Sequence, residues 1–226
     1  MVAISLNKGK DDIFSGYSKL ETPEERKESK VEGGLLFEGF EELVKQYEEI
    51  LAIDNWNIAK KALAKLAKID SILEPDQINS FLQATVKYGD YRDYSWNTGD
   101  FITRLIQNSH EAGNNRFELN TKVLSKEIHG LGYKLKGRED NLLEIIVGGN
   151  TGYACCYEAE NIGKFYIGGN AECNCGYKAK NSTFKTPIRE TLQLLKTYVP
   201  KDKGNRIYFI EPNGKEKEIK EWWPYN

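Results

Sequence analysis

Residues 148–161 read GGNTGYACCYEAEN, and residues 168–181 read GGNAECNCGYKAKN. At this offset of 20 residues the two segments are identical at seven of their fourteen positions, so they are copies of one internal repeat. A unit of this length is too short for a pair of helices, and its apolar stretches lie between Gly and Asn residues. It is typical of one coil of a parallel β-solenoid, in which successive coils pair at about 4.8 Å.

A weaker third copy precedes these two. Asn141 lies 20 residues before Asn161, which in turn lies 20 residues before Asn181. We expect these three residues to form a ladder at one corner of the stack, because asparagine tolerates left-handed backbone and each amide can bond to the next. Gly149 and Gly169 are expected to supply a second corner, at which no Cβ fits.

Two heptapeptides carry a likeness to a known repeat, namely residues 146–152 (IVGGNTG) and 166–172 (YIGGNAE). This stretch resembles the glycine-rich solenoid repeats, sometimes called GXGXG, that occur in the large chains of glutamate synthases and in one chain of formylmethanofuran dehydrogenases. The likeness covers residues 128–187 and departs at Glu172, where the repeat prefers glycine. The resemblance implies a β-solenoid with a structural, interdomain role, and it implies no catalytic residue.

Helical periodicity precedes the repeat. Apolar residues recur at three- and four-residue spacing in four segments, over residues 36–51, 58–69, 78–86 and 101–106. Thr98 is the expected cap of the last of these helices. We therefore predict an α+β chain, in which a helical bundle precedes a short parallel β-solenoid of about three coils with a C-terminal helix and β-hairpin. Its parts are a mobile charged arm (1–34), the helical bundle (35–112), the repeats with a capping helix (113–200), and the hairpin with an aromatic tail (201–226).

The charges of the chain nearly cancel, since 32 Lys and Arg residues stand against 34 Asp and Glu residues. A chain without a basic excess is not expected to bind nucleic acid. No apolar run approaches the roughly 20 residues that a membrane span needs, and the first residues lack the pattern of a signal peptide. We therefore expect a cytoplasmic protein that binds neither nucleic acid nor membranes.

Four cysteines lie within the repeat: Cys155, Cys156, Cys173 and Cys175. Stacking would set Cys155 against Cys175 at a separation that a disulfide accepts. If the segment is a strand, Cys173 shares a face with Cys175 and Cys156 points the opposite way, which disfavours a four-thiolate metal site. Three alternatives remain: packing as small apolar side chains, a disulfide or redox pair, and a Zn or Fe site with His129 as an additional ligand.

An aromatic patch, formed by Tyr91, Arg92, Tyr94 and Trp96, is suited to stacking on sugars or bases. Two aspartates interleave the patch and would repel phosphate, so a sugar is favoured over nucleic acid. Packing between the helices and the repeat is the plainer alternative.

The chain has two histidines, and neither belongs to a recognisable catalytic triad or dyad. His110 closes a predicted helix, where a protonated imidazole would face the negative end of the helix dipole. His129 precedes a glycine. We expect both histidines to have ordinary surface roles.

Common catalytic motifs do not occur in the sequence, which contains no Walker loop, dinucleotide fingerprint, nucleophile elbow or His-Glu-x-x-His motif. We therefore expect a non-catalytic interaction or scaffold module without a cofactor, which binds a protein partner or associates with itself. A cysteine-based metal-binding or redox protein is the first alternative. A small enzyme or binder that acts on sugars through the aromatic patch is the second.

Overall fold

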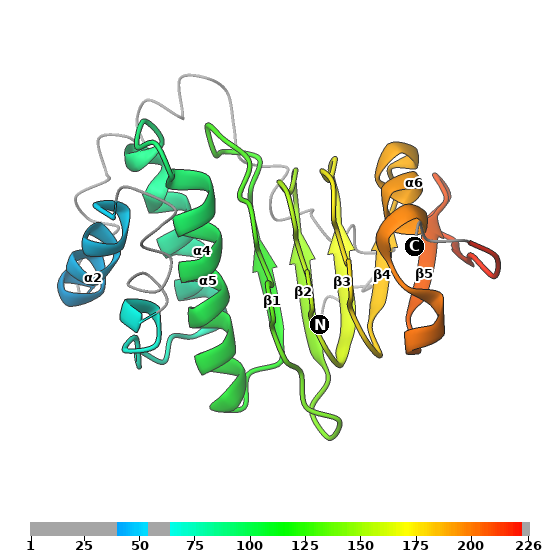
Figure 1. Ribbon diagram of the computed structural model, residues 1–226, viewed down its shortest axis with the longest axis horizontal. Helices are drawn as coiled ribbons and strands as arrows, with labels where there is room; N and C mark the ends of the chain where they lie inside the picture. Colours follow the sequence, from blue (N-terminus) through cyan, green and yellow to red (C-terminus); the bar gives the residue numbers. More distant parts are fainter. Residues whose placement is uncertain (1–39, 54–63, 223–226) are drawn as a thin grey trace, which may run out of the picture.

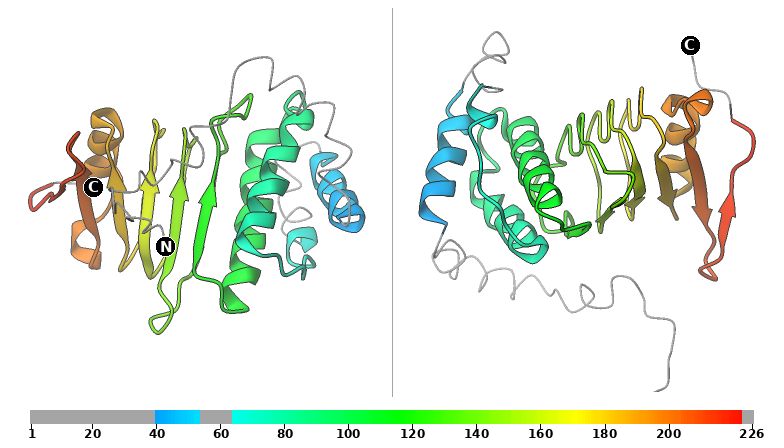
Figure 2. Two further views of the ribbon diagram at one scale, coloured as in Figure 1. Left: turned by 180° about the vertical axis from the view of Figure 1, so that it is seen from behind. Right: turned by 90° about the horizontal axis from the view of Figure 1, so that it is seen from below.

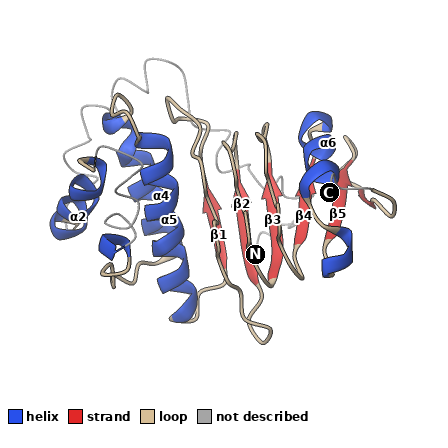
Figure 3. Ribbon diagram, viewed as in Figure 1, coloured by secondary structure: helices blue, strands red, loops and turns tan. Residues whose placement is uncertain are grey.

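The computed structural model describes residues 40–53 and 64–222. The arm predicted over residues 1–34, the first half of the helix predicted over 58–69 and the last residues of the aromatic tail lie outside this part. The described chain combines helices with one six-stranded, mostly parallel sheet, which is an α+β arrangement (Figure 3). None of the helices in these ranges is long and apolar enough to cross a membrane.

Three of the predicted helices are present. They are α2 (Glu41–Leu51), α4 (Pro75–Ala84), which continues into the 3-10 turn η3 (Thr85–Tyr88), and α5 (Tyr94–Glu111). These helices lie together beside the first strand of the sheet, where α4 makes the closest contact with that strand (Figure 1).

The helical core is a cluster of aromatic rings around Tyr47. The centroid of this ring lies 5.6 Å from Phe81, 5.4 Å from Tyr88 and 5.0 Å from Phe101, all edge to face. Such pairs stabilise a core beyond the burial of their area. The Tyr47 hydroxyl shares a 2.7 Å hydrogen bond with Thr98 Oγ1. The prediction that Thr98 caps a helix was therefore wrong: α5 begins earlier, and Thr98 is a buried partner of Tyr47 inside it.

The six strands are neighbours in sequence order: β1 (Arg116–Leu119), β2 (Leu143–Val147), β3 (Ile162–Ile167), β4 (Thr183–Thr186), β5 (Arg206–Ile210) and β6 (Glu216–Glu218). The first five pair in parallel, and β6 returns antiparallel to β5. One apolar residue from each parallel strand lies in register with the next and is fully buried; these are Phe117, Ile145, Phe165, Phe184 and Ile207. This row forms the core beneath the sheet.

The segments that join the strands also stack on one another, in the same order as the strands (Figure 2, right). The Lys134 amide donates to the Tyr157 carbonyl at 2.8 Å. The Glu158 amide donates to the Tyr177 carbonyl, also at 2.8 Å. Successive copies are therefore hydrogen-bonded through their turns as well as through their strands.

The first copy is longer than the sequence offset suggested. Lys136 pairs with Glu160, which pairs with Lys180, so the spacing is 24 residues in the first step and 20 in the second. Gly137 consequently takes the position that Asn161 occupies in the next copy. A Cβ on Gly137 would lie only 2.0 Å from the Asn161 carbonyl oxygen, so the backbones meet closely at this point.

The asparagine ladder links two of its three expected members. Asn161 and Asn181 have φ angles of 58° and 47°, and Asn181 Nδ2 donates to Asn161 Oδ1 at 3.3 Å. Asn141 instead donates to the Gly113 carbonyl. The expected place of Asn141 in the ladder was wrong because the four extra residues of the first copy carry it past the corner.

Gly149 and Gly169 lie where two backbones approach each other. A Cβ on Gly169 would lie 2.6 Å from the Gly149 carbonyl carbon. A Cβ on Gly149 would lie 2.8 Å from the Lys122 amide nitrogen. Neither position has room for a side chain, because contacts below about 3 Å would force the backbones apart.

Side chains of helix α5 accept hydrogen bonds from the backbone of residues 132–138, which form the turns of the first copy and have no preceding copy to pair with. Three residues on one face of the helix accept backbone amides of that segment: Thr103 from Gly132 at 2.7 Å, Gln107 from Lys136 at 3.0 Å, and His110 from Arg138 at 3.2 Å. In the second copy, the amides equivalent to those of Gly132 and Lys136 belong to Cys156 and Glu160, and they donate to the Leu131 and Leu135 carbonyls of the first copy instead. The helix thus supplies the acceptors that a preceding copy would supply, and these three amides are all paired.

This role explains why the prediction for His110 was wrong. His110 is fully buried rather than a surface cation. Its Nε2 accepts the Arg138 amide, and its Nδ1 lies 2.8 Å from the Asn114 carbonyl. A ring that accepts through Nε2 and donates through Nδ1 is the neutral tautomer.

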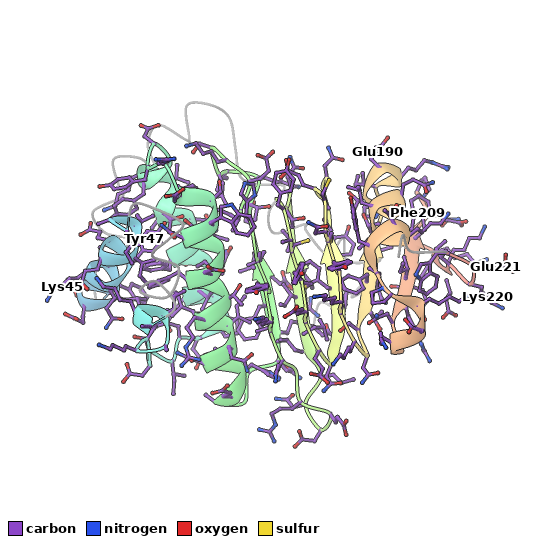
Figure 4. The ribbon with its side chains drawn as sticks, viewed as in Figure 1. Lys45, Tyr47, Glu190, Phe209, Lys220 and Glu221 are labelled. Carbon is purple, nitrogen blue, oxygen red and sulfur yellow. The ribbon has the colours of Figure 1, made fainter. Side chains whose placement is uncertain are left out.

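At the opposite end of the sheet, α6 (Arg189–Tyr198) packs against β4 and β5. Trp222 is buried there and donates from Nε1 to the Val199 carbonyl at 2.9 Å. The expected aromatic tail therefore begins as part of the core. Lys220 and Glu221, just before it, are exposed and extend away from the sheet (Figure 4).

Substitutions at Asn161 test the left-handed turn. Asn161→Val should lower the free energy of unfolding by about 1–2 kcal/mol, because a side chain branched at Cβ is strained in left-handed backbone. Asn161→Gly removes the same side-chain amide, but glycine adopts left-handed backbone without strain, so the free energy of unfolding should fall much less. Urea denaturation measures both. Equal losses in the two variants would mean that the amide ladder, and not the backbone conformation, stabilises this corner.

Candidate functional site

A groove of about 580 Å³ lies beside the stacked turns, near the end of α6. Its walls come from three copies of the repeat and from the segment that follows α6. The lining residues are Lys134, Lys136, Glu158, Glu160, Tyr177, Lys178, Lys180, Tyr198, Pro200, Asp202 and Lys203. Five lysines among these face three carboxylates, so the groove carries a net positive charge although the whole chain does not.

A row of three tyrosines lies beside the groove, and one of them, Tyr177, lines it. The ring centroids of Tyr133 and Tyr157 are 5.6 Å apart, and those of Tyr157 and Tyr177 are 5.3 Å apart. All three side chains are partly exposed. The row follows from the backbone register, because hydrogen bonds between successive turns bring equivalent residues of successive copies side by side.

The residue after each tyrosine forms a charged row. Glu158 lies between Lys134 at 3.6 Å and Lys178 at 3.4 Å, so one carboxylate bridges two ammonium groups. Contact with Tyr133, and then with Glu158, raises the pKa of Lys134. Contact with Glu158 raises the pKa of Lys178. Both lysines are therefore charged at neutral pH.

A second charged row lies two residues further along each copy. Its members are Lys136, Glu160 and Lys180, whose backbones are joined by parallel bridges. Within the described residues, none of these three side chains forms an ion pair or a side-chain hydrogen bond. Their charged groups are therefore open to a ligand.

The groove was not among the predicted sites, although the sequence carries its signal. The segments 133–136 (YKLK), 157–160 (YEAE) and 177–180 (YKAK) share the order tyrosine, charge, apolar, charge. The first of them lies 24 residues before the second, so an alignment at an offset of 20 misses it. Alternation within each segment sends the apolar residue into the core and both charges outward.

The predicted aromatic patch is divided by the start of α5. Tyr94 is fully buried, and its hydroxyl shares a 2.9 Å hydrogen bond with Thr85 Oγ1. Tyr91 and Arg92 are exposed. Trp96 lies elsewhere, against the repeat. The prediction of one continuous patch was wrong because Tyr91 and Arg92 precede α5, whereas Tyr94 and Trp96 lie in its first turn, where helical geometry directs them to different sides.

Trp96 instead joins a second aromatic cluster with His129 and Tyr153. The His129 ring lies 5.1 Å from Trp96 and 5.2 Å from Tyr153, and the two outer side chains are 36% and 44% exposed. The Tyr153 amide donates to His129 Nδ1 at 3.1 Å, and burial lowers the pKa of the imidazole. The ring is therefore neutral near pH 7 and packed between two aromatic neighbours, which differs from the ordinary surface role that was predicted.

Two carboxylates adjoin this second cluster. Burial raises the pKa of Asp100 to about 6. Glu172 lies 3.8 Å from His129 Nδ1, and burial, followed by the charge of Glu127, raises its pKa. This contact is not an ion pair near pH 7, because the imidazole is neutral. Although 37% of the Glu172 side chain is exposed, its Oε2 atom is buried and has no hydrogen-bond partner among the described residues.

The cysteines are brought together only in part. Cys155 Sγ and Cys175 Sγ lie 2.8 Å apart as a hydrogen-bonded pair of free thiols. Cys156 is also fully buried, whereas Cys173 is exposed. The predicted faces of Cys156 and Cys173 were wrong because this segment forms turns, in which Cys156 has a φ of 52°, and not a strand.

Two of the buried thiols, Cys156 and Cys175, are held in their protonated form. Burial raises the pKa of Cys156 well above its usual value. The hydrogen bond with Cys155, followed by burial, does the same for Cys175. Thiolates are the reactive and metal-binding form, and these groups stay protonated. In the part of the chain that the structure describes, no group of three or more His, Cys, Asp or Glu side chains is arranged to hold a metal ion.

Comparisons with protein-family models, with curated proteins and with solved structures found no match to this chain.

Thiol alkylation tests the state of the cysteines. Under native, non-reducing conditions, iodoacetamide should modify Cys173 alone, because the other three thiols are buried. After denaturation, all four should react, as counted by intact-mass spectrometry. A Cys173→Ser variant should remain unmodified in the native state. Two thiols that stay unreactive after denaturation without reductant would reveal a disulfide and contradict the assignment of four free thiols. A bound metal in the native mass would contradict it as well.

Asp100→Asn tests the buried carboxylate. An acid whose pKa is raised in the folded state stabilises folding only at low pH, and that contribution is lost as pH rises from about 4 through 6. The variant should therefore be more stable than the native chain at pH 8, on the order of 2 kcal/mol, and the difference should shrink toward pH 4. Urea denaturation across this range measures it. A difference that does not vary with pH would contradict the raised pKa.

Proposed function

We propose that this chain is a non-catalytic binding module, in which the repeats form a short β-solenoid and the N-terminal helices cover its first end. Five strands in parallel order, together with turns that pair one copy apart, support the solenoid. The resemblance of residues 128–187 to GXGXG repeats agrees with it. In the families that carry those repeats, the solenoid is mainly structural and lies between domains.

The groove is the observation that carries this proposal. Its walls are rows of side chains from equivalent positions, in which lysine alternates with glutamate from copy to copy, so a ligand that lies along the stack meets a regular pattern of charges. The row of Lys136, Glu160 and Lys180 is exposed or partly exposed and makes no ion pair among the described residues. Surface side chains in one regular row, left without internal partners, are suited to binding.

The charge states in the groove favour binding over catalysis. A lysine acts as a nucleophile or a base when its pKa is lowered. Lys134 and Lys178 have raised pKa values and remain ammonium groups. Such groups attract anions and donate hydrogen bonds, but they do not accept protons near pH 7. The expected protein partner or self-association stays a prediction.

A thermal-shift screen against peptides, oligosaccharides and nucleotides tests the proposal. A ligand that binds only the folded state raises the melting temperature. At least one class should do so for the native chain and not for the double variant Lys136→Gln, Lys180→Gln. Lys217→Gln, an exposed lysine of β6 outside the groove, is the matched control and should behave like the native chain. A screen without any shift, or conversion of a bound ligand to product, would contradict the proposal.

Sugar binding at the second aromatic cluster is a second candidate function. The observation that favours it is the pair of exposed rings, Trp96 and Tyr153, beside the buried and unpartnered Oε2 of Glu172. Aromatic faces stack on sugar rings, and a carboxylate oxygen accepts a hydroxyl proton. In the same screen, a ligand belongs to this cluster if Trp96→Ala abolishes the rise in melting temperature and the double variant Lys136→Gln, Lys180→Gln retains it.

A further inference from the structure

We infer that the groove binds an acidic polysaccharide, which is an extended chain of sugar rings that carry carboxylates. This inference rests on the proposed function, because it names the ligand class of the groove described above. It is carried by three features: the spacing of the rows, the balance of charges within them and the continuation of the rows beyond the third copy.

The spacing of the rows favours a chain of rings over a peptide. Successive tyrosine rings beside the groove are 5.6 and 5.3 Å apart. The paired backbones that carry the charged residues are about 4.8 Å apart, so one ring and one set of charges recur at each step of about 5 Å. An extended peptide advances about 3.3 Å per residue, and its same-face side chains recur at about twice that distance. Neither distance matches the rows. An extended pyranose chain advances by roughly the length of one ring per unit, which is close to this step.

The charge balance indicates a ligand with separated negative charges. Lys136 and Lys180 have no ion-pair partner in the described chain. Lys203, whose ammonium group lies 3.3 Å from the Asp202 carboxylate, adds a third positive charge at the end of the groove. Carboxylates placed at intervals along a polymer would pair with these lysines. The exposed position of the groove keeps each such pair modest, so affinity requires several of them along one chain.

The carboxylates in the same groove disfavour a polymer with a phosphate on every unit. Glu158 and Glu160 stand in the middle of the two charged rows, and Asp202 lies near the end. A continuous line of phosphates would meet these acids as well as the lysines. Sugar hydroxyls can donate to the same carboxylates, and the tyrosine rings offer faces on which sugar rings pack. Mixed charges between aromatic rings therefore suit a hydroxyl-rich polymer better than nucleic acid.

The rows continue past the third copy, which lengthens the binding surface. The Asn181 amide donates to the Lys203 carbonyl at 2.8 Å, so the segment after α6 stacks on the third copy as a fourth layer. Pro200 and Lys203 line the groove in that layer. A ligand that spans all four layers gains one set of contacts in each. Longer oligosaccharides should therefore bind more tightly than short ones until the groove is filled.

Isothermal titration calorimetry tests the inference with a hexasaccharide in which uronic acids alternate with neutral sugars, so that every second ring carries a carboxylate. The neutral hexamer of glucose and an oligothymidylate of equal charge are the reference ligands. The acidic sugar should bind most tightly, and high salt should weaken it, because exposed charges are screened. The double variant Lys136→Gln, Lys180→Gln should lose about tenfold or more in affinity, which corresponds to about 1.4 kcal/mol. The control Lys217→Gln should bind as the native chain does.

The outcomes separate this inference from the proposed function. Equal affinity for the neutral sugar, tighter binding of the oligothymidylate, or no binding of the acidic sugar would overturn the inference. If a peptide or another ligand then binds in a manner that the groove variant abolishes, the proposed function stands. If the groove variant binds every ligand as tightly as the native chain does, both the inference and the proposed function are overturned.

Discussion

The register between successive copies of the repeat is the constraint on which the structure depends. Each copy satisfies the backbone amides of its neighbour, through the strands and equally through the turns. A stack of this kind leaves an unpaired edge at each end, and open edges invite uncontrolled pairing. The first edge is closed by side chains of α5, with Thr103, Gln107 and His110 in place of main-chain carbonyls. Burial of a neutral histidine is one consequence, because only the neutral ring accepts an amide.

The surface inherits this register. Residues at the same position of successive copies lie side by side, so each outward-facing position of the repeat forms a row across the surface. Tyrosines form an aromatic row, and in each charged row the glutamate of the second copy lies between the lysines of the first and third copies. Like charges at this distance would destabilise the stack, and the alternation limits that repulsion while leaving a net positive groove. Stability of the fold and the proposed binding chemistry are thus set by the same residues.

The repeat at residues 148–181 was enough to predict parallel pairing, the close approach at Gly149 and Gly169, and the contact of Cys155 with Cys175. The failures have local causes. Four extra residues in the first copy moved Asn141 off the corner and concealed the YKLK segment. Left-handed turns replaced an expected strand around Cys156, so the alternation of faces did not apply. The prediction of an aromatic patch failed because closeness in the sequence does not determine to which side each ring points where a helix begins.

Amide hydrogen exchange, followed by NMR, tests the pairing of the stack through its turns most directly. Lys134, Ala154 and Glu158 have left-handed backbone and lie in turns, where amides ordinarily exchange fast. Each donates to a carbonyl one copy away, at 2.8, 2.9 and 2.8 Å respectively. We predict that these three amides exchange as slowly as those in the middle of β2 and β3. Exchange at the rate of an exposed loop, while the strands remain protected, would contradict a stack that is paired through its turns.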